Sequence, residues 1–255
     1  MNGAAEELEW TKNPMNGVKP FDESLHAPYT EEQPNSLEPH EVPAFLAKMR
    51  EKYPQHFAMI VLGFVTGLRP SSLRPLRRGG ATPDLLLDSG LLYVRRSQTL
   101  GDEIMPTTKT KRNQRIALPA SVVDILRWHI DNLPEGPMRT SELLFPSESG
   151  GFRATSVLKK PFDDVGRAIG LAKHVSPRAM RRTFQDLARA AAVGDLVTRA
   201  VSGHATEQMH RHYSTVGVEE IRTGLGRVAE VVDLDAFRPS GVQGGVREGG
   251  DKQSA

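Results

Sequence analysis

Apolar residues along most of this 255-residue chain recur with the period of an α-helix. A first helix is predicted to begin near Pro39, and Pro43 should cost it one early backbone hydrogen bond. The segment HFAMIVLGFV (56–65) is almost wholly apolar but too short to span a bilayer, so we expect a helix at the centre of the core. Gly67 then offers the left-handed conformation that ends such a helix.

Residues 79–118 have a different pattern, with several glycines and Pro83 separating short apolar runs. The runs LLYV (91–94) and RIAL (115–118) are typical of strands. The intervening MPTTKTKRNQ can supply a third strand and a tight turn, which would complete a small antiparallel sheet.

Helical patterns return after this sheet, and a short helix is also expected before it. The predicted segments are 70–77, 121–133, 156–169 (with an internal Pro161), 177–192, 195–202, 206–213 and 218–232. The predicted fold class is therefore mainly α with a small antiparallel β-sheet (α+β).

The two ends of the chain lack such periodicity. Residues 1–35 combine four prolines with scattered acidic residues, so we expect a linker or the stub of a missing N-terminal domain. Residues 238–255 form a glycine-rich tail that is predicted to be disordered. The interval 36–237 is the expected folded domain, within the usual size of one large or two small domains.

Composition excludes several classes of protein. The chain has no cysteine, and therefore no disulfide, thiolate metal site or cysteine nucleophile. No stretch approaches about 18 apolar residues, and the N-terminus lacks the features of a signal peptide. We therefore expect a soluble, cytoplasmic protein with no membrane partner.

Charge is distributed unevenly along the chain. Residues 57–227 carry 25 Lys and Arg against 16 Asp and Glu, whereas both flanking segments are acidic. A basic body favours a polyanionic partner such as DNA or RNA, although a mildly basic soluble domain would have the same composition. Many of the basic residues stand in short clusters, among them Arg74, Arg77, Arg78, Arg95 and Arg96.

Two of the basic segments could contact phosphate. Arg69 follows the glycine that ends the apolar helix, and its guanidinium could bind phosphate oxygens, unless it is an ordinary surface arginine. In TKTKRNQR, Lys109 and Lys111 share one strand face. With Arg112 and Arg115 they could reach a nucleic acid, or they could simply protect a sheet edge.

A third segment, SPRAMRRTF, should begin a helix. Ser176 can cap it, and Arg178 and Arg181, three residues apart, share one face near the positive helix end, which suits an anion. Arg182 is turned by about 100° and could instead pair with Asp186, four residues further on.

The fourth segment, SGHATEQMHRHYS, contains His204 and Tyr213. Gly203 ends the preceding helix, so His204 should lie in a turn and both side chains could face one cleft. His204, His210 and His212 form an unconvincing metal site, and a lone tyrosine is usually a core or surface residue.

Taken together, these segments match a known set of motifs. The pieces TGLRPSSLRPLR, TKTKRNQRIALP, RAMRRTF and SGHAT, with the later HYS, stand in the order and spacing of the tyrosine recombinases. In that family the motifs usually read T-G-[LM]-R, T-K-T in a β-hairpin, H-x-L-R-[HR]-T-F, and L-G-H with a tyrosine nine residues later. From Ser36 to about Phe237 the chain resembles the catalytic domain of this phage integrase family.

The resemblance implies a role for each matching residue. Tyr213 looks like the nucleophile, Arg69 and Arg181 like the two catalytic arginines, His204 like the following histidine, and Lys109 like the hairpin lysine. Arg178 stands where the family usually has histidine, and arginine cannot act as a base. Lys111, Arg112, Arg115 and Arg182 are candidate DNA contacts.

The implied activity is site-specific recombination through a 3′-phosphotyrosyl intermediate, with double-stranded DNA as partner and without cofactor or metal. The helix at 218–232 resembles a segment that docks onto a neighbouring subunit, so we expect assembly, as a tetramer, on DNA. Two alternatives stay open. One is a catalytically inactive DNA-binding remnant, and the other is a topoisomerase with the same groups that only relaxes DNA.

Overall fold

Helix α3 (Pro54–Thr66) lies at the centre of the hydrophobic core, as predicted, and every residue from Phe57 to Thr66 is buried. The computed structural model describes residues 35–98, 104–105, 114–203 and 218–239, and all statements below concern these ranges. Gly67 ends α3 in the left-handed conformation, with φ of 63°, and its N–H donates to the carbonyl of Gly63 at 2.9 Å.

Helix α2 (Val42–Lys52) begins later than predicted. The residues before it form a turn in which the N–H of Glu41 donates to the carbonyl of Glu38 at 2.9 Å. Pro43 therefore lies in the first helical turn, where the backbone N–H has no helical acceptor, and the expected loss of a hydrogen bond does not occur. The predicted apolar face is confirmed, because Val42, Phe45, Leu46 and Met49 are all buried.

The larger sheet has three antiparallel strands in the order β1 (Leu85–Leu86), β2 (Leu91–Val94) and β5 (Gln114–Ala117). Leu92 pairs with Ile116 across β2 and β5, and both side chains are buried. The edge strand β1 comes from the chain before β2. Residues 106–113, most of the segment expected to supply a third strand, lie outside the described residues, so that expectation stays a prediction. A second, two-stranded sheet pairs β3 (Ser97–Gln98) with β4 (Ile104–Met105).

The remaining helices account for most of the predicted helical segments. They are α4 (Pro70–Leu73), α5 (Ala120–Asp131), α6 (Pro137–Thr140), α7 (Lys159–Ala168), α8 (Met180–Ala190), α9 (Asp195–Ser202) and α10 (Val218–Val231), with 3-10 turns η2 (Pro177–Ala179) and η4 (Leu234–Phe237). Helix α4 stops early because Pro75 has no N–H to continue it. The predicted helix at 206–213 lies outside the described residues. The mainly helical fold with a small antiparallel sheet is confirmed.

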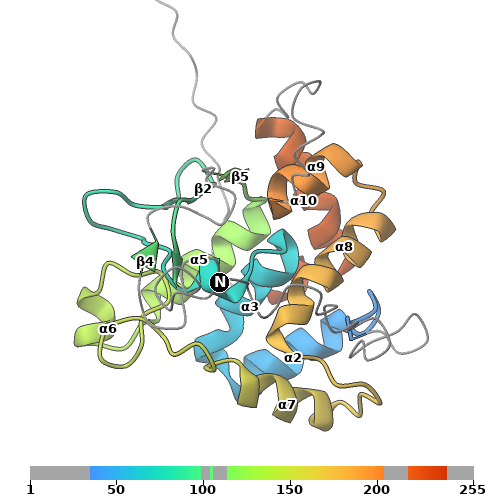
Figure 1. Cartoon of the computed structure of the whole chain (residues 1–255), viewed down its shortest axis with the longest axis horizontal. Coiled ribbons are helices and arrows are strands. Elements are labelled where there is room, and N and C mark those ends of the chain that lie inside the picture. Colours follow the sequence, from blue (N-terminus) through green and yellow to red (C-terminus); the bar gives the residue numbers. More distant parts are fainter. Residues whose placement is uncertain (1–34, 99–103, 106–113, 204–217, 240–255) are drawn as a thin grey trace, which may run out of the picture. The chain divides into compact units, whose positions relative to one another are not determined.

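Helix α10 packs against α8, α9 and β5 of its own chain, and the three helices lie together in Figure 1. Its apolar residues Ile221, Leu225 and Val228 are buried there. The chain itself covers the apolar face of this helix, and docking of the helix onto a neighbouring subunit stays a prediction.

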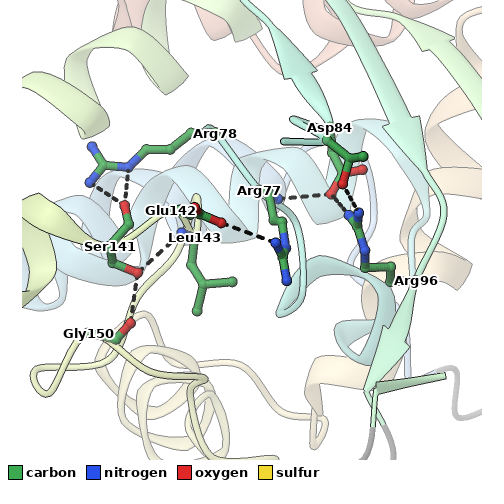
Figure 2. Close-up of polar contacts among 9 residues, drawn as sticks. Arg77, Arg78, Asp84, Arg96, Ser141, Glu142, Leu143 and Gly150 are labelled. Carbon is green, nitrogen blue, oxygen red and sulfur yellow. Dashed lines mark hydrogen bonds and ion pairs between the residues drawn. The ribbon is translucent and has the colours of Figure 1, made fainter. Parts of the chain in front are cut away.

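Several arginines of the basic clusters have internal partners (Figure 2). Asp84 is 1% exposed and pairs with Arg96 at 2.8 Å, while the backbone N–H of Arg77 donates to the same carboxylate at 3.0 Å. The guanidinium of Arg77 pairs with Glu142 at 3.1 Å. These contacts fasten the start of the sheet region to the chain around residue 142.

Two further arginines satisfy neutral acceptors. Arg78 donates to the carbonyl of Ser141 at 2.8 Å, just past α6, and Arg74 donates through Nε to the side-chain oxygen of Gln98 at 2.6 Å. Arg74 is buried, so its charge is shielded from solvent. Much of the basic character of residues 74–96 thus holds the fold together, and it is a weaker sign of a polyanion partner than the sequence suggests.

None of the described helices combines the length and the apolar run that crossing a bilayer requires.

A cluster of neutral histidines and a buried arginine lies between α3 and α5. Arg153 is 3% exposed and donates to the carbonyls of Pro146 and Gln55 and to Nδ1 of His56. His129 on α5 is also buried and contacts the carbonyl of Leu144 through Nε2 at 3.1 Å. Burial, reinforced by the charge of Arg153, lowers the pKa of both histidines to about 4.

Folding stability should therefore fall in mild acid. Below pH 6.5 the unfolded chain takes up protons on these histidines, whereas the folded protein stays neutral there until about pH 4. The contribution of the two neutral histidines to the free energy of unfolding is thus fully present above pH 6.5 and is lost on acidification towards pH 4. At pH 5 the protonation of His129 in the unfolded chain should lower the free energy of unfolding by about 2 kcal/mol, and that of His56 should lower it further.

Urea unfolding followed by circular dichroism at pH 7.5 and pH 5 measures this loss. A His129→Gln variant, which keeps a donor but cannot titrate, should show a smaller difference between the two pH values. The matched change at exposed His40, His40→Gln, should leave the difference as it is in the wild type. Equal stability of the wild-type protein at both pH values would contradict the prediction.

Candidate active site

The first catalytic candidate, Arg69, stands just beyond the end of the central helix. Its backbone is extended, with φ of −69° and ψ of 148°, and its carbonyl accepts the N–H of Ser72 at 2.8 Å, so that it begins α4. The side chain is exposed and forms no ion pair within the described part of the chain. A cation on a rigid, buried helix end is thereby presented to solvent.

Gly67 brings the end of α3 into direct contact with α8. A Cβ added to this glycine would lie 2.6 Å from Cδ1 of Phe184, closer than side chains tolerate. Phe184 itself is fully buried on α8. Position 67 thus requires glycine for two reasons: its φ is positive, and the ring of Phe184 leaves no room for a side chain.

The second candidate, Arg181, lies in the first turn of α8 and points to this junction. Its Nη1 donates to the carbonyl of Gly67 at 3.2 Å. Burial, followed by the nearby charge of Arg69, lowers the pKa of Arg181 to about 10. The guanidinium is still protonated at neutral pH, so the positive charge of Arg181 lies near that of Arg69 at the α3–α8 junction. The structure therefore brings together Arg69 and Arg181, which are 112 positions apart in the sequence.

Arg178 lies in η2, the 3-10 turn that precedes α8. The expectation that Ser176 caps the helix through its side chain is wrong, because it makes no capping hydrogen bond and α8 begins only at Met180. Arg178 and Arg181 therefore belong to successive elements and not to one regular helix. The side chain of Arg178 is exposed and pairs with no carboxylate among the described residues.

The alternative pairing of Arg182 with Asp186 is not formed. Asp186 instead accepts a hydrogen bond from Ser36 Oγ at 2.9 Å and pairs with Arg189 at 3.1 Å. Arg182 reaches Asn35 Oδ1 at 3.4 Å. The N–H of Leu37 also donates to the buried Thr183 Oγ1, at 3.0 Å, so residues 35–37 are attached to the same helix that carries Arg181.

The other candidates are placed only in part. Arg115 on β5 is exposed. Lys109, Lys111, Arg112, His204 and Tyr213 lie outside the described residues, and their roles stay predictions. Two described residues near these segments are in contact. Nε2 of Gln114 donates to the carbonyls of Ala200 and Val201, both at 3.2 Å, at the end of α9. This contact was not predicted, since a glutamine in a basic strand carries no distinguishing signal.

No group of three or more His, Asp or Glu side chains within the described ranges is arranged to hold a metal ion.

Comparison with solved structures identifies the fold as that of tyrosine recombinase catalytic domains. A structure of the Tn1549 transposon integrase with circular intermediate DNA is similar at a TM-score of 0.60 and 21% identity, covering 89% of this chain and 76% of that one. A lambda integrase dimer bound to a COC′ core site is similar at a TM-score of 0.54 and 15% identity, covering 85% and 72%. At these identities the likeness concerns the fold alone.

The sequence profile of the phage integrase family matches residues 35–220, which is most of the chain. The protein therefore belongs to the phage integrase family, and the resemblance seen in its motifs is confirmed. No curated protein matches the chain.

The contact between Gly67 and Phe184 leads to a stability prediction. Gly67→Ala places a side chain on a residue with φ of 63° and into the Phe184 ring, so it should destabilise the fold by about 2–4 kcal/mol. Urea unfolding measures the difference. Gly79→Ala is the matched control, because a Cβ there meets no atom within 4 Å, and it should change stability by less than about 0.5 kcal/mol. A loss at Gly67 no larger than at Gly79 would contradict the assigned role.

Proposed function

We propose that the protein is a site-specific DNA recombinase that cuts and rejoins DNA through a 3′-phosphotyrosyl intermediate. The observation that carries the proposal is the convergence of Arg69 and Arg181 at the α3–α8 junction. Membership of the phage integrase family supports it, as do similar solved structures of integrases bound to DNA.

Two guanidiniums held near each other repel, and a bound anion relieves this repulsion. The phosphodiester of DNA carries one negative charge, and a further charge develops on its oxygens when a nucleophile attacks. Donors that are already in place for that charge are a large source of catalysis, about 3–4 kcal/mol for one donor. Arg69 and Arg181 fit this role, because the fold fixes the positions from which both project.

The chemical step is assigned to residues that the family motifs supply. The phenolate oxygen of Tyr213 attacks the phosphorus, the bond from phosphorus to the 5′-oxygen breaks, and Lys109 gives a proton to the departing oxygen. His204 donates a hydrogen bond to the phosphate. A 5′-hydroxyl from another strand reverses the step, so the energy of the phosphodiester is conserved and the scheme uses no nucleotide cofactor.

We assign Arg178 a part as cationic donor to the phosphate. Arginine stays protonated at all ordinary pH values, so it can stabilise charge but cannot accept a proton from Tyr213. The exposed Arg115, with Lys111, Arg112 and Arg182, would contact the DNA backbone on either side. We further propose that the protein assembles on double-stranded DNA as a tetramer, with contacts other than the apolar face of α10.

Arg178 also favours a second candidate function. Since the family usually has histidine at this position, the chain could be a DNA-binding remnant that keeps the fold and the arginines but has lost strand cleavage. Formation of a covalent adduct separates the two candidates.

The decisive experiment captures that adduct. The protein is incubated with a pool of random-sequence duplexes that carry a nick, then denatured, and the DNA linked to protein is recovered and sequenced. We expect a covalent adduct from the wild type, none from Tyr213→Phe, and enrichment of a DNA sequence that reveals the target site.

Tyr93→Phe is the matched control. Tyr93 lies on β2, where its ring contacts Arg95, and it belongs to none of the motifs assigned to the chemical step, so this variant should retain the adduct. Lack of adduct from the wild type across the pool, with DNA binding retained, would support the inactive remnant. An adduct that survives in Tyr213→Phe would reassign the nucleophile.

The proposed role of Arg178 gives a pH prediction of definite sign. In Arg178→His the new side chain loses its charge as the pH rises through about 6.5. If position 178 acts as a cationic donor, the ratio of variant to wild-type cleavage rate should fall as pH increases from 6 to 8. A ratio that rises over this range would show that the position serves as a base.

A further inference from the structure

Gln114 lies near the end of the basic segment TKTKRNQR and begins β5. Its side chain caps the end of α9, whose carbonyl acceptor at Ala200 lies 86 positions later in the sequence. Its amide nitrogen donates to the carbonyls of Ala200 and Val201, both at 3.2 Å. Strand β5 and helix α9 are thereby joined by one neutral side chain.

The end of α9 needs such a donor. The last carbonyls of a helix have no partner within the helix, and burial makes an unsatisfied carbonyl costly. Gly203 caps α9 with φ of 69°, and its N–H satisfies only the carbonyl of Arg199, at 2.8 Å. Gln114 satisfies the next two carbonyls along the chain.

The amide lies directly against the capping glycine. A Cβ added to Gly203 would be 2.5 Å from Nε2 of Gln114, so any other residue at position 203 would displace the amide. Gly203 and Gln114 are thus matched to each other, and their contact requires both a residue without a side chain and a donor of this length.

The position of this contact in the chain suggests its purpose. The segment with Lys109 ends at Gln114, and the segment with His204 and Tyr213 begins after Gly203. We infer that Gln114 is a positioning residue for the cleavage step, because it holds together the two backbone points from which these segments depart. The inference rests on the proposed function and adds to it a residue that touches neither DNA nor the reacting atoms.

Three substitutions at this position separate hydrogen bonding from packing. Gln114→Lys keeps a donor that can reach the carbonyls, Gln114→Met keeps the length but has no donor, and Gln114→Glu turns acceptor oxygens towards two carbonyls. We expect the rate of adduct formation at saturating DNA to fall in the order wild type, Lys, Met, Glu. The loss should be about tenfold for Met, which makes neither hydrogen bond, and larger for Glu.

DNA affinity and the melting temperature are measured alongside the rate. A positioning role predicts that affinity for the enriched duplex stays within about threefold of the wild type while the rate at saturation falls. Gln55→Glu, an exposed change of the same charge at the start of α3, is the control and should cleave like the wild type. If the Glu variant does not fold, the comparison of Met with Lys decides the question.

Each outcome has a definite meaning. Adduct formation by the wild type, with Met slowed and Lys closer to the wild type, supports the inference. A Met variant within twofold of the wild type, or a Lys variant slower than Met, overturns the inference and leaves the proposed function in place. If the wild type forms no adduct, the proposed function fails and the inference fails with it.

Discussion

The site depends on one packing contact, the end of α3 against the first turns of α8. Gly67 has no side chain, so the Phe184 ring can lie against it, and this closeness lets Arg181 donate to the Gly67 carbonyl at 3.2 Å. Arg69, two residues further on, projects from the same junction. A buried apolar contact thereby fixes the position of the half-buried charge of Arg181 relative to the exposed charge of Arg69, and the hydrophobic core provides the rigidity that charge stabilisation requires.

Arginine serves two distinct purposes in this fold. Some guanidiniums have partners within the fold. Arg96 forms an ion pair with the buried Asp84, and Arg78 donates a hydrogen bond to the carbonyl of Ser141 (Figure 2). Others, such as Arg69 and Arg178, are exposed and pair with no carboxylate in the described part of the chain. Sequence clusters of basic residues mix these two groups, and only the three-dimensional partners separate cations that build the protein from cations that are left for a ligand.

The sequence predicted the fold class well because its strongest signals are local. The apolar run of α3, its glycine end and the four buried residues of α2 each follow from spacing alone. The candidate site followed from motifs, which name residues but not their contacts. Helix starts were misjudged where turns intervened, as before α2 and α8. The hydrogen bond from Ser36 to Asp186 and the Gln114 bridge join residues far apart in the sequence, and no periodicity encodes them. The edge strand β1 pairs locally with β2, in a hairpin too short to give a clear strand pattern.

The attachment of residues 36 and 37 to α8 has a practical consequence. Ser36 and Leu37 are tied by hydrogen bonds to Asp186 and Thr183, and Leu37 is completely buried. A domain fused upstream of these residues would therefore join the chain directly beside the contacts that hold the helix of Arg181. A fusion boundary placed before Asn35 keeps both hydrogen bonds, whereas a truncation past Leu37 would remove them from α8.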